Sequence, residues 1–232
     1  MTPHTKVTIT LKKNDARGLL SAFTIMALWL GLLVVSLSMA VSFTNPIVYL
    51  LILVIAHLYT GLFITAHDAM HGLVHHNKKL NTAVGYFVTA LYMFINYGRL
   101  YTRHHKHHDH VHTADDPDYH NGSFIAWFFK FLKEYITIWQ ILFAAIAFNL
   151  LKLIIPVENL LLFWILPSIL SMFQLFYFGT YVPHKGEHNN EHHSTTLKKN
   201  HIWAFISCYF FGYHYEHHDS PATPWWLLWK LK

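Results

Sequence analysis

Histidines at helical spacing are the feature of this sequence best suited to chemistry. The chain has 21 histidines in 232 residues, and most of them gather in four clusters, at residues 67–71, 104–108, 188–193 and 214–218. Neutral imidazole is the commonest metal ligand among side chains. On a helix, residues three and four apart lie on one face, so HxxxH and HxxHH spacings point several rings in one direction. The clusters therefore predict a metal site.

The number of histidines predicts more than one metal ion. The first, second and last clusters offer eight candidate ligands, and the irregular third cluster is expected to add His192, with His188 and His193 as alternatives. A tetrahedral zinc ion uses about four ligands, and an octahedral ion uses about six. We therefore predict two metal ions, held by His67, His71, His104, His107, His108, His192, His214, His217 and His218.

The composition of the clusters narrows the choice of metal. The single cysteine excludes a cysteine-rich cluster, and all-imidazole sites suit Zn, Cu, Fe or Ni. Metal-bound imidazoles commonly donate their second N–H to a carboxylate or a carbonyl. We expect this orienting role for polar residues beside the clusters, namely Asp68, Asp116, Asp118, His184, Glu191, His193 and Glu216.

Long apolar stretches separate the clusters and must position them. Hydrophobic residues make up 53% of the chain and charged residues only 12%, about half the charged share of soluble domains. Residues 18–66 contain no Asp, Glu, Lys or Arg, and a turn signal at residues 42–46 divides them. Because about 20 apolar residues cross a bilayer, we predict four transmembrane helices. Their expected bounds are residues 19–42, 46–66, 135–155 and 159–181.

Two further apolar stretches are less suited to spanning. Residues 82–98 favour a re-entrant or interfacial hairpin, and the aromatic residues 123–133, which include two lysines, favour an interfacial helix. The Pro-Trp-Trp segment that begins at Pro224 is typical of an anchor at the lipid headgroups. The predicted fold class is an all-α integral membrane protein, a single domain over residues 1–232 with a histidine-rich cap.

The basic residues predict the orientation of the chain. With four spans, 16 of the 17 Lys and Arg residues fall on the face that carries all four histidine clusters. The positive-inside rule makes that face cytoplasmic, together with both termini. These residues lie at the ends of apolar runs, so the net charge of +5 indicates membrane flanks and no nucleic-acid partner. A cleaved signal peptide is the alternative for the first apolar stretch.

Short sequence motifs around the histidines carry a family resemblance. They are AHDAMHG at residues 66–72, HHKHH at 104–108, DPDYH at 116–120, FGTYVPH at 178–184, FGYHYEHH at 211–218 and PWW at 224–226. The chain resembles the membrane di-iron superfamily of fatty-acid desaturases, hydroxylases and alkane monooxygenases. Within that superfamily it is similar to the bacterial and cyanobacterial β-carotene ketolases, over about residues 60–226.

The resemblance implies a non-haem di-iron oxygenase in a bacterial inner membrane. Such an enzyme takes O₂ and external electrons, expected from reduced ferredoxin, and oxidises the allylic 4-position of the β-ionone ring of β-carotene. Two hydroxylations at one carbon give a geminal diol, which loses water to leave a ketone. The implied products are echinenone and canthaxanthin, with astaxanthin formed from zeaxanthin.

The substrate implied by the resemblance fits the composition. A carotenoid is apolar and about as long as a bilayer is thick, so its site must open to lipid. Aromatic residues make up 17% of the chain and provide flat walls for a conjugated ring. We expect the ring to be lined by residues close to the clusters in sequence, namely Met70, Phe94, Tyr97, Phe178, Tyr181, Phe210 and Tyr213.

Two other functions compete with this one. A carotenoid ring hydroxylase or a fatty-acyl desaturase or hydroxylase would use the same metal chemistry on another substrate. A membrane metal transporter is the alternative from a different class. Transporters place ionisable ligands inside spanning helices, whereas here only His57 lies within a predicted span and away from its end.

Overall fold

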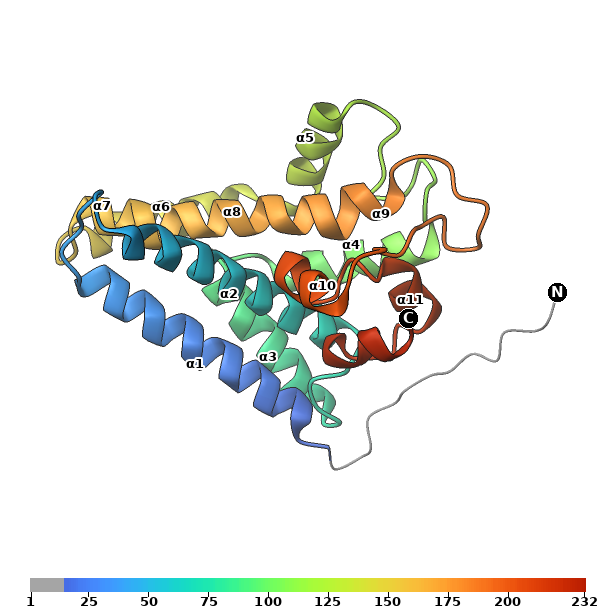
Figure 1. Ribbon diagram of the computed structural model, residues 1–232, viewed down its shortest axis with the longest axis horizontal. Coiled ribbons are helices and arrows are strands. Elements are labelled where there is room, and N and C mark those ends of the chain that lie inside the picture. Colours follow the sequence, from blue (N-terminus) through green and yellow to red (C-terminus); the bar gives the residue numbers. More distant parts are fainter. Residues whose placement is uncertain (1–14) are drawn as a thin grey trace.

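The computed structural model describes residues 15–232, and that range is helical apart from its loops and one isolated β-bridge between Thr196 and Tyr213 (Figure 1). Six helices begin at an Asn, Ser or Thr whose side-chain oxygen accepts a backbone N–H, which satisfies an otherwise unpaired donor. The elements are α1 (Arg17–Ser38), α2 (Pro46–Met70), α3 (Lys78–Leu91), α4 (Tyr97–Asp109), α5 (Phe124–Tyr135), α6 (Ile138–Leu151), α7 (Val157–Asn159), η1 (Leu160–Ile165), α8 (Leu166–Leu175), η2 (Phe176–Tyr181), α9 (Val182–His184), α10 (His201–Cys208), α11 (His214–Asp219) and η3 (Trp225–Lys230).

Within residues 15–232, three helices are long and apolar enough to cross a bilayer. They are α1, α2 and the continuous helix Val157–His184, which joins α7, η1, α8, η2 and α9. The predicted all-α membrane architecture is therefore confirmed. The expectation for the N-terminus concerns residues 1–14, which lie outside the described residues.

The predicted span at residues 135–155 is not one straight helix. Helix α6 has 14 residues, about 21 Å of rise, which is shorter than the hydrocarbon core. It follows α5 after a bend of 81°, so a fourth span exists only if the two helices count as one broken crossing. The break has a local cause, since Thr137 is extended and its hydroxyl caps α6.

The long helix Val157–His184 changes its winding twice. Each π-helical segment, η1 and η2, ends shortly before a proline, Pro167 in α8 and Pro183 in α9. Proline has no N–H and its ring crowds the carbonyl one turn earlier. A wider turn relieves that crowding, and such turns are frequent at functional sites.

The apolar stretch at residues 82–98 forms parts of two helices joined by a turn. Helix α3 ends at Leu91, and α4 begins at Tyr97. Between them, Met93 and Phe94 have positive φ angles of 53° and 62°, and Asn96 caps α4. The turn between α3 and α4 agrees with the expected reversal of the chain, while its re-entrant or interfacial placement stays a prediction.

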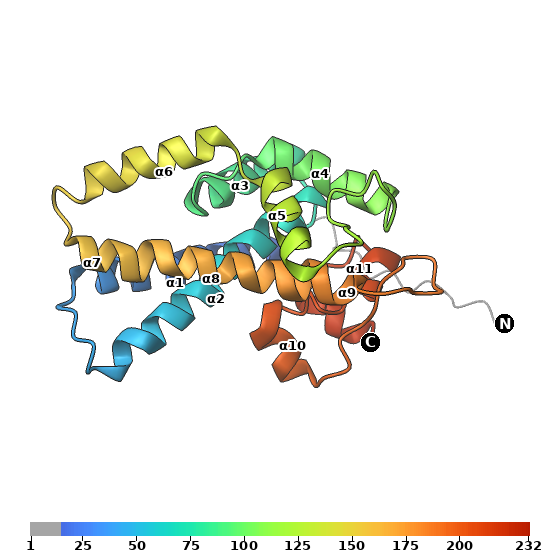
Figure 2. The same cartoon turned by 90° about the horizontal axis from the view of Figure 1, so that it is seen from above.

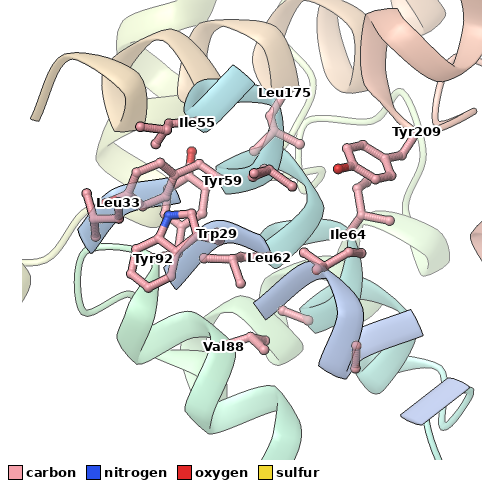
Figure 3. Close-up of a cluster of buried hydrophobic side chains, with 14 of the residues drawn as sticks. Trp29, Leu33, Ile55, Tyr59, Leu62, Ile64, Val88, Tyr92, Leu175 and Tyr209 are labelled. Carbon is pink, nitrogen blue, oxygen red and sulfur yellow. The ribbon is translucent and has the colours of Figure 1, made fainter. Parts of the chain in front are cut away.

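Helix α2 lies at the centre of the core, between α1, α3 and α8 (Figure 3). Tyr59 packs edge-on against Trp29 of α1 and against Tyr92 after α3, with centroid distances of 5.3 Å in both cases. The Tyr92 hydroxyl donates to Ser171 Oγ at 2.9 Å, and Thr60 of α2 bonds the same oxygen at 2.8 Å. Such polar contacts join helices where water is scarce.

The two ends of the molecule differ in character. The α1–α2 and α6–α7 connections lie together at one end (Figures 1 and 2). There the Asn159 amide donates to the carbonyls of Ser36 and Met39. Helices α4, α9 and α11 gather at the opposite end. Histidines far apart in sequence therefore meet at one end of the bundle.

The packing of α1 predicts a contrast between two of its glycines. A methyl group at Gly18 would lie 2.4 Å from the Val74 carbonyl oxygen, whereas one at Gly31 meets no described atom within 4 Å. We expect Gly18→Ala to destabilise the protein by about 1–3 kcal/mol, because a backbone atom must shift. Gly31→Ala should leave stability unchanged or slightly higher. Thermal unfolding in detergent measures both, and equal melting temperatures would contradict the packing.

Candidate metal centre and substrate cavity

Four elements bring histidines to one end of the molecule. The end of α2 carries His67, with His71 at its C-cap one helical turn later. Helix α4 carries the HxxHH cluster at residues 104–108, and the short helix α11 carries the cluster at 214–218. Helix α9 ends at His184, which is buried. In each element these rings lie on the side that faces the other three elements.

The rings assemble into two groups. The first imidazole group consists of His67, His71, His104 and His217, and the second consists of His107, His184, His214 and His218. Within each group the potential ligand atoms all lie within 4.8 Å of one another. His108 lies between the groups, with its Nε2 3.0 Å from Nε2 of His217 and its ring stacked on His218 at 4.2 Å. Nine imidazoles therefore converge.

Two of the ring nitrogens have more nitrogen neighbours than hydrogen bonding alone can satisfy. His217 Nε2 lies 3.2 Å from His67 Nε2 and 3.0 Å from His108 Nε2. His218 Nε2 likewise has two ring nitrogens as neighbours, at 3.1 Å and 3.0 Å. A neutral imidazole nitrogen offers either one N–H or one lone pair, so neither ring can pair fully with both partners. A cation that accepts several lone pairs at once fits this arrangement, and an all-nitrogen donor set suits iron.

Burial keeps most of these rings uncharged. It lowers the pKa of His104, His214, His217 and His218 well below the usual value, and repulsion between imidazolium forms of neighbouring histidines lowers each pKa further. Burial, with the same kind of repulsion, lowers the pKa of His108 to about 2. Only neutral imidazoles can coordinate a metal. The centre therefore holds its rings in the binding form at neutral pH.

His107 is oriented by a buried carboxylate. Burial lowers the pKa of His107, but the nearby Asp118 and the hydrogen-bonded Asp116 raise it by more, so the net shift is upward. The His107 Nδ1–H donates to Asp116 Oδ1 at 2.8 Å. Asp116 also accepts the backbone N–H groups of His112 and Asp118. Asp116 thus directs His107 Nε2 toward the second imidazole group.

His184 is oriented by a backbone carbonyl. Its Nδ1 lies 3.1 Å from the carbonyl oxygen of His193 and must donate, because a carbonyl only accepts. Its Nε2 is then a lone-pair donor, 2.8 Å from Nε2 of His214. The expected orienting role of His193 is thus carried by its main chain, while its ring stacks on His112.

The other expected orienting residues have different surroundings. Asp68 lies 3.8 Å from His67 Nδ1 and accepts the backbone N–H of Trp225. Asp118 lies 4.0 Å from His107 Nδ1, accepts the Tyr135 hydroxyl, and has its pKa raised by burial to about 6.

Glu216 and Glu191 do not bond to a ring of either imidazole group. Glu216 accepts the Thr196 hydroxyl and so ties α11 to the preceding loop. Glu191 is exposed, and its carboxylate lies 3.3 Å from His192 Nε2.

The ninth converging ring is His184 and not His192. His192 Nε2 lies beside Glu191 and Asp219, outside both imidazole groups. His192 belongs to a loop, whereas His184 ends a long helix and cannot move away from the cluster. Spacing did not single out His184, because its one histidine neighbour at helical spacing, His188, was grouped with the loop cluster at residues 188–193. Its position at the end of an apolar helix, which it shares with His67, was the available signal.

An apolar cavity adjoins the rings of both groups. His67, His104, His107 and His214 form part of its wall, and Asp118, Gln140 and Thr180 add polar atoms. The remaining lining is largely apolar and consists of Phe63, Tyr92, Ile95, Leu100, Phe131, Leu132, Tyr135, Ile136, Met172, Leu175, Gly179 and Phe211. The Phe211 ring lies 4.7 Å from the His67 ring and 5.3 Å from the His214 ring.

The seven residues expected to line the substrate ring lie outside this cavity wall. They are Met70, Phe94, Tyr97, Phe178, Tyr181, Phe210 and Tyr213. Their direct sequence neighbours Ile95, Gly179, Thr180 and Phe211 do line it. Proximity in sequence found the right segments, but neighbouring side chains on a helix or a tight turn point in different directions.

Two of these residues show where the side chains lie instead. Tyr97 packs against Gly85, where an added methyl group would lie 2.4 Å from its ring. Tyr181 joins an aromatic cluster with Phe124 and Trp127.

Known proteins are similar to this sequence over most of its length. The fatty acid desaturase family model matches residues 44–148 and 125–232. A β-carotene ketolase of a Paracoccus species is 35% identical over 94% of this chain and 94% of its own length. A β-carotene 4-ketolase of Protosiphon botryoides and a zeaxanthin 4-ketolase of Chlamydomonas reinhardtii are both 37% identical, over 93% and 95% of this chain. No solved structure matches the chain.

The protein family is identified by the fatty acid desaturase model, which covers more than half of the chain. The Paracoccus protein narrows it further, because the two chains match over nearly their whole lengths. This chain therefore belongs to the fatty acid desaturase family and, within it, to the group that contains the Paracoccus β-carotene ketolase. The chain spans 63% and 54% of the lengths of the two algal relatives.

The environment of Asp116 predicts a contrast with its neighbour. Asp116 is fully buried and accepts three N–H groups, whereas the Asp115 side chain is 72% exposed and pairs only with Lys106 among the described residues. We expect Asp116→Ala to cost about 1–3 kcal/mol or more, because buried donors lose their acceptor. Asp115→Ala should cost less than about 1 kcal/mol. Thermal unfolding in detergent compares them, and similar losses would refute the orienting role of Asp116.

Proposed function

We propose that this protein is a β-carotene 4-ketolase, an O₂-dependent oxygenase with two non-haem irons. The observation that carries the proposal is the convergence of nine imidazoles beside an apolar cavity. The names of the relatives favour ketone formation over ring hydroxylation or acyl desaturation. Echinenone and canthaxanthin are the expected products from β-carotene, with astaxanthin formed from zeaxanthin.

The two imidazole groups, together with His108, would hold the two irons. Most of these rings are buried, and their Nε2 atoms approach one another within each group, which is a donor arrangement that suits iron. His184 takes the place expected of His192 in this ligand set. Bound iron would supply the activation of O₂ needed to oxidise a ring methylene carbon.

The protein's own contribution would be to orient the ring and to exclude water. Phe211 lies beside one ring of each imidazole group, and Phe63 and Tyr92 extend the aromatic wall. Gly179 allows Phe211 its position, because a methyl group there would lie 2.6 Å from the Phe211 ring. A flat conjugated ring held on these faces would present one edge to the metal centre.

The remaining parts of the proposal concern surroundings and electrons. The polyene chain of the substrate would extend from the cavity into lipid, since the helices that surround it have apolar, exposed outer faces. We further propose a reduced ferredoxin as electron donor, and a bacterial inner membrane with the metal centre on the cytoplasmic side. The basic residues that flank the apolar helices support this orientation.

Pigment analysis tests the activity directly. The chain is expressed in a host that accumulates β-carotene, with iron and oxygen supplied, and the pigments are separated by chromatography. We expect echinenone or canthaxanthin. His217→Ala should reduce ketone to background, because it removes a ring at the centre of the first group, whereas His76→Ala changes an exposed histidine and should have little effect. Accumulation of only hydroxylated carotenoids, or of unchanged β-carotene alone, would reject the proposal.

Metal analysis tests the ligand set. The purified chain should contain about two irons, and His184→Ala should lower that content by about half or more. His192→Ala should keep the full content, because its ring lies outside both groups. A single bound zinc would exclude the di-iron centre. Iron loss in His192→Ala with retention in His184→Ala would restore His192 as the ninth ligand.

A further inference from the structure

A third cluster of possible ligands lies outside both imidazole groups. It consists of Glu191, His192 and Asp219, whose ligand atoms lie within 4.8 Å of one another. His192 Nε2 is 3.3 Å from Glu191 Oε1 and 3.5 Å from Asp219 Oδ1. Glu191 comes from the loop after α9, and Asp219 is the last residue of α11. Two distant segments thus bring two carboxylates to one ring nitrogen.

The His192 ring nitrogen has the surroundings of a metal ligand. Its side chain is only 16% exposed. The buried Nε2 makes no hydrogen bond to any described residue, although both carboxylate oxygens are within 3.5 Å. The three residues therefore offer one nitrogen and two oxygen donors around a common point. A divalent cation at that point would accept the ring lone pair and one oxygen from each carboxylate.

The donor types define the class of cation. Calcium prefers a shell made of oxygen atoms, whereas a mixed set of imidazole and carboxylate suits first-row divalent ions such as Mn²⁺ and Fe²⁺. We propose that Glu191, His192 and Asp219 form a third, accessible site for such an ion, and that Fe²⁺ binds there on its way to the buried centre.

The position of this cluster carries the loading role. The second imidazole group consists entirely of buried residues, so iron must reach it through the protein. The His192 ring lies 5.9 Å from the ring of His218, a member of that group, and Asp219 directly follows His218 in α11. The side chain of Glu191 is 62% exposed and open to solvent. An ion could therefore exchange water ligands for carboxylate ligands before it binds the rings of the second imidazole group. This role rests on the di-iron centre proposed above, whereas binding of the ion does not.

Manganese binding tests the site itself. The iron-loaded full chain in detergent is titrated with Mn²⁺, and bound ion is measured by electron paramagnetic resonance. We expect one additional bound Mn²⁺, with affinity lowered at least tenfold in Glu191→Gln and in Asp219→Asn. Glu187→Gln, which changes an exposed carboxylate of the same loop outside the cluster, is the matched control. Absence of binding, or equal affinity in all variants, would overturn the site.

Iron uptake tests the loading role. The chelator-treated full chain is given Fe²⁺, and protein-bound iron is measured against time. We expect Glu191→Gln and Asp219→Asn to slow uptake at least threefold and to reach the same final content as Glu187→Gln. Equal rates would overturn the loading role even if Mn²⁺ binds. These readouts are independent of ketone formation, so failure of the third site and failure of the ketolase proposal are distinguishable.

Discussion

The crowding of uncharged imidazoles at one end of the bundle is the constraint on which the rest depends. Each ring at this site has its nitrogen within about 3 Å of another ring nitrogen, as between His184 and His214 at 2.8 Å. Burial disfavours the charged imidazolium form and thereby lowers the pKa of His108 and His217. Without that proton the two rings do not repel their neighbours as cations. Such a cluster can persist only if the surrounding helices hold every ring in place.

The surrounding structure supplies that support in layers. Helix α2 packs against α1, α3 and α8, so its histidine-bearing end has little freedom. Asp116 holds His107 and the loop after α4 at the same time, through three hydrogen bonds. The carbonyl of His193 holds His184, and Asp68 links the His67 region to the segment at Trp225. Elements far apart in sequence therefore stabilise one centre.

Polar and apolar chemistry meet at a single boundary beside this centre. The cavity wall combines rings of both groups with largely apolar residues. Phe211 lies at that boundary, in a position that the small residue Gly179 makes possible. The mixed cluster at Glu191, His192 and Asp219 lies near the same rings but is accessible to solvent.

The sequence by itself determined the all-helical membrane class, the chain reversal near residues 82–98 and eight of the nine converging rings, because helical period and apolar length are local properties. Only the tertiary structure decided the rest. It brought in His184, whose partners are distant in sequence, and it placed His192 beside two carboxylates. It broke the apolar run after Tyr135, where Thr137 begins a new helix at a steep angle. It also turned Phe211, and not Phe210, into the cavity. Side-chain direction and ligand identity depend on how helices pack, and no local pattern encodes that packing.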